Sequence, residues 1–321
     1  MMAGLPVKID DITGAEARIR GLVRRTPMIG DPRLPGVLLK QEYRQATGSF
    51  KLRGATNAVL ELSPQALARG VVTASTGNHG RALADAARAA GGRAVVCLSR
   101  LVPANKVQAV RDLGAEVRIV GRSQDEAMAE VARAVAEEGL AEVPPFDAAA
   151  VVAGQGTLGL EILADCPAPS AVLVPLSGGG LASGVAAAVK ALSPATRVIG
   201  VSMARGAAMA ASLAAGRPVE VEEEPTLADS LGGGIGLGNL VTFAMCRALL
   251  DDVVLVTEGE IAAAMCHIHA VTGDALEGAA AVGHAAILSG RVSPGRDTVC
   301  ILSGANVAPE TFTRVLEDPA R

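Results

Sequence analysis

One lysine stands out among the residues that could do chemistry. Lys51 lies between a turn that contains Gly48 and a run of helix-forming residues, and Gly54 would allow another segment to approach closely. A lysine amine becomes a nucleophile when burial or a nearby cation lowers its pKa, whereas an isolated lysine is most often a surface residue. Lys51 is therefore a candidate nucleophile only if other segments supply the partners of a bound ligand.

A glycine-rich segment provides the first of these partners. Residues 177–181 read Ser-Gly-Gly-Gly-Leu, after an apolar stretch at 171–176 and before a helix predicted over 181–192. Glycines at a strand-to-helix turn let successive N–H groups converge on an anion at the positive end of the helix dipole. A flexible linker is the alternative, but a linker rarely joins a buried strand to a helix. The chain has no GxxxxGK[ST], and this glycine run lacks the GxGxxG order used for dinucleotides, so the segment indicates a phosphate without a nucleotide.

Two further polar segments follow predicted strands. Residues 75–80 read Ser-Thr-Gly-Asn-His-Gly and precede a helix predicted over 79–90, so they could hold a second anion such as a carboxylate. Residues 303–306 offer the hydroxyl of Ser303. Ligands of α/β proteins gather at the carboxyl ends of the strands. We therefore expect these segments and Lys51 to face one crevice.

The elements that must position these residues alternate along the chain. Short apolar runs alternate with longer Ala-rich segments, which is typical of βα units and a parallel sheet. Ser123 and Glu126 form a capping-box pattern that predicts a helix start, and Pro144-Pro145 indicates a lobe boundary near residues 145–155. Strands are expected at 71–74, 94–98, 116–120, 171–176, 197–201, 253–256 and 298–302.

Composition restricts the class of protein and of partner. The 321 residues are 50% hydrophobic and 19% charged, with a formal net charge of −4 and no long run of one sign. A folded chain that binds a small molecule is expected, rather than one that binds nucleic acid or a membrane. The apolar stretches are shorter than a membrane span, and no signal segment opens the chain, so the expected location is cytoplasmic.

The cysteines and histidines do not predict a metal site or a disulfide framework. The five cysteines are scattered, with no CxxC pair. Cys266, His267 and His269 are neighbours in sequence, but residues one or two apart on a helix point in different directions. No shared metal site is expected from these three residues.

Taken together, the motifs resemble the fold-type II pyridoxal-phosphate enzymes of the threonine and serine dehydratase family, which also includes serine racemase. The resemblance covers nearly the whole chain, in order, through residues 25–27, 49–51, 75–80, 177–181, 277–279 and 303–306. The connecting segments at 99–103, 200–203 and 229–234 look most like those of the hydroxyectoine-utilisation dehydratases.

The resemblance implies a two-lobed α/β fold of the tryptophan synthase β type, with parallel sheets flanked by helices. It predicts a large cofactor-binding domain from residues 1–60 and 150–321, and a small βα domain from residues 61–149. The implied cofactor is pyridoxal 5′-phosphate (PLP), the implied partner is a small amino-acid substrate, and a homodimer is expected because homodimers are usual in the family.

The resemblance also implies roles for single residues. Lys51 would bind PLP covalently and later remove the Cα proton, while Phe50 would pack beside the ring. Asn78 would contact the ring hydroxyl, Ser303 would meet the pyridine nitrogen, and Glu277 would lie near the lysine. The phosphate would be held by Gly178, Gly179, Gly180 and Leu181, and the substrate carboxylate by Ser75, Thr76, Gly77, Asn78 and His79.

The implied reaction removes water from a β-hydroxy α-amino acid of the threonine or serine type and gives a keto acid and ammonia. A hydroxyectoine-derived 3-hydroxy-2,4-diaminobutyrate would suit this chemistry, because it carries a free α-amine.

Several positions depart from the family pattern. Thr76 stands where serine racemases have a serine that exchanges the proton opposite the lysine. Thr76 is a second catalytic candidate, and a PLP-dependent amino-acid racemase is the alternative function. Ser202 and Ala208 replace acidic residues that bind a divalent cation in some relatives, so no metal is expected there. Ala280 and Ala305 replace usual glycines.

Overall fold

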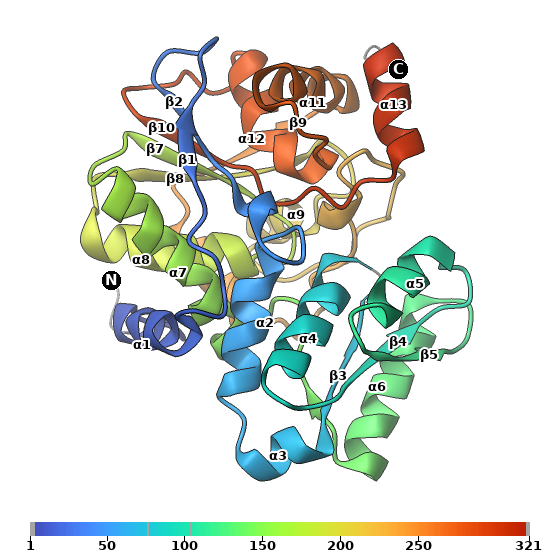
Figure 1. The fold of residues 1–321 in the computed structure, drawn as a ribbon. Helices are drawn as coiled ribbons and strands as arrows, with labels where there is room; N and C mark the ends of the chain where they lie inside the picture. The colour runs from blue at the N-terminus through green and yellow to red at the C-terminus, as the bar shows by residue number, and fades with distance from the viewer. Residues whose placement is uncertain (1–3, 76, 103, 319–321) are drawn as a thin grey trace.

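The chain forms two lobes, each built around its own β-sheet (Figure 1). The computed structural model describes residues 4–75, 77–102 and 104–318. The amino-terminal segment and the carboxyl-terminal half build the larger lobe, and the segment between them builds the smaller one.

The large lobe contains a six-stranded sheet in the order β1-β2-β10-β7-β8-β9. β1 pairs antiparallel with β2, and all other neighbours pair parallel. The strands are β1 (Met28–Gly30), β2 (Val37–Lys40), β7 (Ala171–Pro175), β8 (Arg197–Met203), β9 (Asp252–Val256) and β10 (Thr298–Ile301).

Helices cover both faces of this sheet because its strands carry apolar side chains on both faces. In β10, Cys300 belongs to the core on one face, whereas Val299 and Ile301 belong to the core on the other. The first face packs against α11 (Glu258–Thr272) and α12 (Gly278–Leu288), with α13 (Pro309–Glu317) outside them. The second packs against α1 (Ile9–Ile19), α7 (Ala149–Asp165), α8 (Gly180–Leu192), α9 (Ala208–Ala215) and α10 (Thr242–Leu249).

The small lobe repeats this layering on a four-stranded parallel sheet in the order β5-β4-β3-β6. Its strands are β3 (Val71–Ala74), β4 (Ala94–Leu98), β5 (Glu116–Ile119) and β6 (Ala141–Glu142). The core on one face joins α2 (Lys51–Leu60), α4 (Asn78–Ala89) and α5 (Ala104–Arg111), and α6 (Gln124–Glu138) covers the other. The short elements α3 (Pro64–Arg69), η1 (Glu42–Arg44) and η2 (Asp229–Leu231) complete the chain.

The predicted parallel sheets flanked by helices are confirmed. Every expected strand is present, and Ser123 accepts a hydrogen bond from the Glu126 N–H in the expected capping box. β1, β2 and β6 were not predicted. The strands β3–β6 all fall within residues 61–149, but α2 contacts both α4 and α7, so the domain boundaries stay a prediction.

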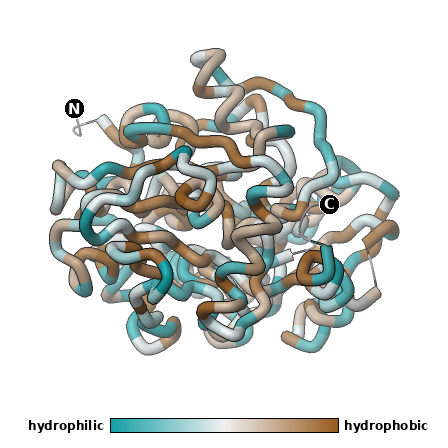
Figure 2. Tube along the Cα trace, turned by 90° about the horizontal axis from the view of Figure 1, so that it is seen from above, coloured by the Kyte–Doolittle hydropathy of each residue, from teal (hydrophilic) through white to brown (hydrophobic). Residues whose placement is uncertain are grey.

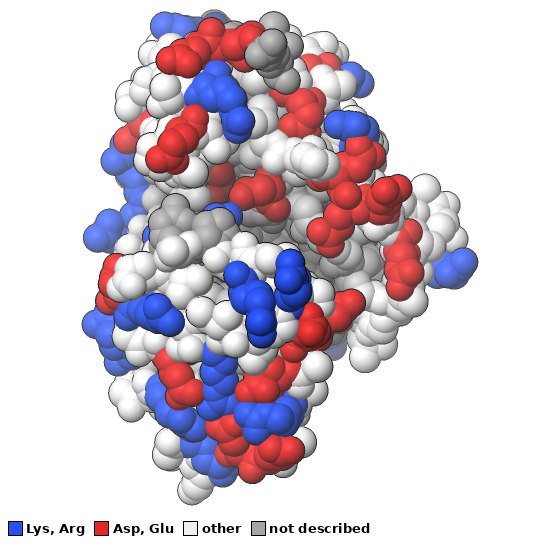
Figure 3. Space-filling view, turned by 90° about the vertical axis from the view of Figure 1, so that its right-hand side faces the viewer, with Lys and Arg blue, Asp and Glu red and all other residues white. Residues whose placement is uncertain are grey.

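The surface and interior have the polarity expected from the composition. Hydrophobic segments run through the interior, with hydrophilic segments mostly at the periphery (Figure 2). Acidic and basic side chains are interspersed on the face shown in Figure 3. Within the described residues, none of the helices combines the length and apolarity needed to cross a membrane.

Candidate active site

Lys51 lies at a junction between the two lobes. α2 begins at Lys51, directly after Phe50. The Phe50 N–H donates to the backbone oxygen of Ser303 (3.0 Å), and the Lys51 Nζ donates to the backbone oxygen of Pro145 (2.7 Å). Ser303 follows β10 at its carboxyl end. The lysine is therefore held at the edge of the large sheet where α/β proteins bind their ligands.

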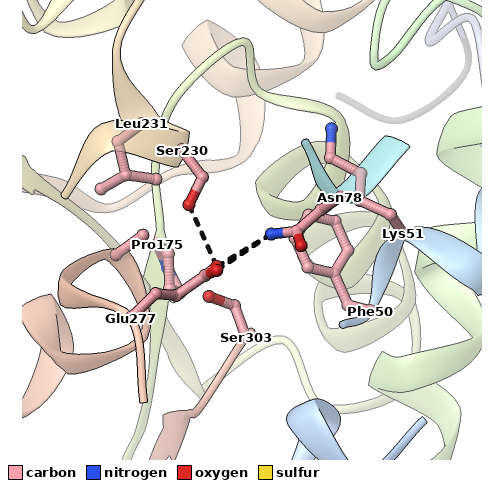
Figure 4. A pocket seen from close by; sticks show the side chains of 9 residues that line it. Phe50, Lys51, Asn78, Pro175, Ser230, Leu231, Glu277 and Ser303 are labelled. Atoms are coloured by element: carbon pink, nitrogen blue, oxygen red, sulfur yellow. Dashed lines mark hydrogen bonds between the residues drawn. The ribbon is translucent and has the colours of Figure 1, made fainter. Parts of the chain in front are cut away.

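A cavity of about 40 Å³ lies beside Lys51 (Figure 4). Its walls come from both lobes: Asn78 begins α4 of the small lobe, whereas Glu277 directly precedes α12 of the large lobe. The lining residues are Phe50, Lys51, Asn78, Pro175, Ser230, Leu231, Glu277, Ala279 and Ser303.

Glu277 is the centre of the polar contacts in this cavity. The Asn78 Nδ2 donates to both of its carboxylate oxygens (2.9 and 3.2 Å), and the Ser230 Oγ donates to Oε1 (3.0 Å). Burial raises the pKa of Glu277, the hydrogen bonds from Asn78 and Ser230 oppose that shift, and the charge of Asp229 adds to it. Glu277 therefore retains a proton at higher pH than an exposed glutamate.

Burial also changes the two basic groups near the cavity. It lowers the pKa of Lys51 to about 8, although the negative charge of Glu277 opposes the shift. It lowers the pKa of His79 to about 3, and the positive charge of Lys51 acts in the same direction. At neutral pH the imidazole is therefore uncharged, and an appreciable fraction of the lysine amine is neutral and nucleophilic.

The glycine-rich segment forms the predicted strand-to-helix turn. β7 ends at Pro175, and α8 begins at Gly180 with no side chain capping its first N–H groups. A Cβ at Gly178 would lie 2.4 Å from the ring of Phe146. Gly179 has φ +87°, and a Cβ there would lie 2.8 Å from Met209 Cε. Only glycine fits this turn, and its backbone N–H groups are available to an anion.

The structure brings five predicted site residues together: Phe50, Lys51, Asn78, Glu277 and Ser303 all line one cavity. The remaining predicted positions that the structure describes do not line the cavity. Gly178 and Gly179 follow β7, Gly180 and Leu181 begin α8, Ser75 follows β3, and Gly77 directly precedes α4. Thr76 lies outside the described residues, so its catalytic role stays a prediction.

The structure shows the surroundings of three residues that the sequence singled out, His79, Ala280 and Ala305. The His79 ring is buried and its Nε2 lies 2.9 Å from the backbone oxygen of Val143, while its Nδ1 has no hydrogen-bond partner in the described part of the chain. Its predicted contact with the substrate carboxylate remains untested. Ala280 lies on α12 and is buried in the core, and the partly buried Ala305 packs against the same core. Neither residue lines the cavity, so these replacements do not alter its wall directly.

Sequence reasoning did not assign Ser230, Leu231, Pro175 and Ala279 to the site. Ser230 and Leu231 belong to the segment 229–234, which carried a family resemblance but no chemical role. Phe146 was also missed, because an isolated aromatic residue after Pro144-Pro145 gives no local signal that it packs against Gly178.

Comparison with known proteins agrees with this arrangement. Residues 19–304 match the family described as pyridoxal-phosphate dependent enzymes. The chain belongs to this family. It is 59% identical to a putative threonine dehydratase of Sinorhizobium fredii, over 94% of the chain and 92% of that protein. It is 42% identical to the L-threonine ammonia-lyase of Geobacter sulfurreducens, over 95% of the chain and 77% of that protein. The structure of maize serine racemase superposes with a TM-score of 0.91 at 33% identity, covering 98% of both chains.

The predicted cofactor and fold-type II family are thereby confirmed, and the residues of the site fit PLP. Lys51 would supply the amine, the uncapped start of α8 would supply N–H groups for the phosphate, and Ser303 places a neutral hydroxyl on the wall of the same cavity. When bound, PLP acts as an electron sink that stabilises negative charge at the substrate Cα.

Proposed function

We propose that this chain is a PLP-dependent dehydratase, or ammonia-lyase, which removes water from a β-hydroxy α-amino acid and yields a keto acid and ammonia. The observation that carries the proposal is the position of Lys51, whose lowered pKa suits an acid-base role, on the same cavity as Ser303 and Glu277. The likeness to a threonine dehydratase and an L-threonine ammonia-lyase supports the reaction class.

In this proposal Lys51 removes the Cα proton, since general bases work best when their pKa lies near the working pH. Ser303 would offer the pyridine nitrogen of bound PLP a neutral hydroxyl in place of a carboxylate, which would leave that nitrogen less protonated. Negative charge at Cα is then stabilised only modestly, and the β-hydroxyl leaves, taking up a proton to depart as water. Elimination is therefore favoured over transamination.

An amino-acid racemase is the second candidate, and the likeness to maize serine racemase favours it. Racemisation needs a proton donor on the face opposite the lysine, and the corresponding position here is Thr76. A β-branched hydroxyl has fewer rotamers than a serine hydroxyl, so we rank racemisation second.

The finer substrate proposal is 3-hydroxy-2,4-diaminobutyrate or a derivative of it, formed from hydroxyectoine. Resemblance of the segments 99–103, 200–203 and 229–234 supports it. Asp229, whose charge reaches Glu277 and whose carboxylate pairs with Lys106 at 3.5 Å, would attract the second ammonium group. The intact ring of hydroxyectoine has no primary amine and is not expected to react.

A substrate panel tests the proposal. Purified holoenzyme in D₂O is given L-threonine, L-serine or 3-hydroxy-2,4-diaminobutyrate, and keto acid, ammonia and Cα deuterium are measured. Equal amounts of keto acid and ammonia are expected. Deuterium at Cα without keto acid would instead establish the racemase, and neither product from any of the three would contradict both functions.

A charge variant tests the finer proposal. Asp229→Asn is expected to lower kcat/KM for the diaminobutyrate roughly tenfold, and to leave L-threonine turnover nearly unchanged, because only the first substrate has a second cation. Asp125→Asn on α6 is the control for a lost acidic residue. An equal effect of Asp229→Asn on both substrates would contradict the diaminobutyrate proposal.

We also propose that the enzyme is a cytoplasmic homodimer. The family resemblance supports this proposal, and light scattering of the purified holoenzyme tests the dimer.

A further inference from the structure

A second cluster of chemically capable side chains lies away from Lys51, in the large lobe. The His267 Nε2 and the His284 Nε2 each lie 2.9 Å from the same oxygen of Asp31, Oδ2. One potential ligand atom from each of the three residues falls within 4.8 Å of the others. Three atoms that can each serve as a metal ligand, the two nitrogens once they are deprotonated, therefore converge on one point.

Three separate elements hold this cluster in place. Asp31 follows β1, and its N–H donates to the backbone oxygen of Val37 (2.9 Å) at the start of β2. The Arg33 N–H donates to Asp31 Oδ1 (2.8 Å), which orients Oδ2 toward the imidazoles. His267 lies on α11 and His284 on α12, and these helices pack against each other (Figure 1). The two rings are 4.9 Å apart.

The Asp31 carboxylate is stabilised by hydrogen bonds from the Arg33 N–H and the two imidazoles, without a lysine or arginine partner among the described residues. The Asp31 and His284 side chains are fully buried, and the His267 side chain is 15% exposed. A buried carboxylate is costly unless it is paired with a cation or strongly hydrogen-bonded. A cation at the convergence point would supply that positive charge.

We propose that Asp31, His267 and His284 form a binding site for a divalent transition-metal ion, with Zn²⁺ as the best match. Two imidazole nitrogens and one carboxylate oxygen are ligands that Zn²⁺ accepts, and three protein ligands leave a fourth position for water. Ca²⁺ and Mg²⁺ prefer sites made of oxygen ligands alone. The site is independent of the proposed dehydratase reaction.

The imidazole tautomers permit this ligation without a new unpartnered group. Without metal, a neutral His284 donates its Nε2 proton to Asp31, and its buried Nδ1 has no partner among the described residues. With metal, the proton moves to Nδ1 and Nε2 becomes a ligand. One ring nitrogen is unsatisfied in either state, so this atom does not oppose metal binding.

The ion would act as a clamp rather than as a catalyst. It would join the loop after β1 to α11 and α12. Because α12 begins directly after Glu277, a tighter α12 supports the cavity wall from a distance of about two helical turns. The expected effect of the ion is therefore higher thermal stability.

Metal titration of the intact holoenzyme tests this site. After removal of metals by a chelator, Zn²⁺ and Co²⁺ are added separately, and metal content, Co²⁺ ligand-field absorption and Tm are measured. We expect one ion per chain, a Co²⁺ spectrum with nitrogen ligands, and an increase in Tm.

Variants on α11 provide the comparison. His267→Gln, at the partly exposed edge of the cluster, is expected to abolish stoichiometric binding and the Tm increase. His269→Gln is the matched control, because its ring contacts Phe312 and the backbone of Asp274 instead. Cys266→Ser excludes a thiol ligand, and both control variants should bind one ion.

Two results would overturn the proposal. One is the absence of stoichiometric Zn²⁺ or Co²⁺ binding to the unmodified holoenzyme. The other is binding that survives in His267→Gln, or that is lost in Cys266→Ser. In either case the three residues would be a hydrogen-bonded contact between the loop and the two helices. Because His267→Gln alters only the edge of the cluster, the comparison does not depend on folding of a His284 variant.

Discussion

The amine of Lys51 differs from that of a surface lysine because burial stabilises its neutral form. With a pKa lowered to about 8, its neutral fraction rises about tenfold per pH unit below pH 8 and levels off above it. We therefore expect the rate at which the apoenzyme binds PLP covalently to follow the same curve.

Absorption at the wavelength of the lysine-bound cofactor, recorded from pH 6 to 10, measures this rate. An ordinary lysine would give a rate that continues to rise toward pH 10, since its pKa is about 10.4. Such a continuing rise would show that Lys51 is not the perturbed amine described above.

Sequence reasoning identified the residues whose motif is local. Lys51, Asn78 and Ser303 were found because each follows a strand or a glycine-containing turn. Ser230 was not assigned to the site, because its hydrogen bond to Glu277 joins positions 47 residues apart. The cluster of Asp31, His267 and His284 was missed for the same reason, since the partners of His267 are not its sequence neighbours.

At the scale of elements, the turn between β7 and α8 depends on glycine for two reasons. Gly179 has a positive φ, and a Cβ there would also approach Met209 Cε, Cys246 Sγ and the Thr242 side chain within 3.0 Å. Gly179→Ala is expected to destabilise the protein by about 1–3 kcal/mol and to weaken PLP binding at least tenfold.

Gly216→Ala is the matched control for Gly179→Ala. Gly216 has φ +71°, but a Cβ at this position would meet no atom within 4 Å, and the residue ends α9 at the surface. The variant should lose about 1 kcal/mol of stability with unchanged PLP affinity. Urea unfolding and PLP titration measure both effects, and equal PLP affinity in the two variants would show that the turn does not hold the phosphate.

The strands that were not predicted from the sequence are either short or contain a charged residue. β6 has only two residues, and β1 is an edge strand of three. β2 ends in Lys40, whose side chain is completely buried because Glu161 on α7 pairs with its Nζ at 2.8 Å. A lysine inside a buried strand cannot be recognised from the sequence unless its ion-pair partner is known. The partner of Lys40 lies 121 residues away in the chain.

At the scale of the whole molecule, buried charges join the segments that support Lys51. Arg53 on α2 pairs with Glu42 (2.7 Å) and with Glu161 on α7 (2.7 Å), and its side chain is 1% exposed. Arg53→Met would leave Glu42 buried without its cation. We expect it to destabilise the holoenzyme by about 3–5 kcal/mol in urea unfolding at saturating PLP.

Arg133 on α6 provides the surface comparison. Its side chain is 43% exposed and pairs with Glu130, Glu137 and Glu138. Because water screens these pairs, Arg133→Met should lower the free energy of unfolding much less than Arg53→Met does. Similar unfolding midpoints for the two variants would mean that the buried network does not stabilise the fold.

The two lobes meet through polar contacts beside the cavity. Asn78 and Arg81 on α4 bond to Asn306 of the large lobe, and Asn78 also bonds to Glu277. We expect the small lobe to close around a substrate at these hydrogen-bonded contacts of α4, which would exclude water from the reacting atoms. Hydrogen bonds between segments that are distant in the sequence cannot be predicted from the hydrophobic pattern, although the parallel sheets of the two lobes were predicted from it.

The most direct test of the role of Lys51 compares the absorption spectrum of the purified protein with that of Lys51→Ala, before and after L-threonine is added. We predict a visible band of lysine-bound PLP that is absent in the variant, together with keto acid and ammonia formed only by the unmodified enzyme. A visible band of the same intensity in Lys51→Ala, or equal keto acid from both proteins, would contradict the assignment of Lys51 and with it the proposed reaction.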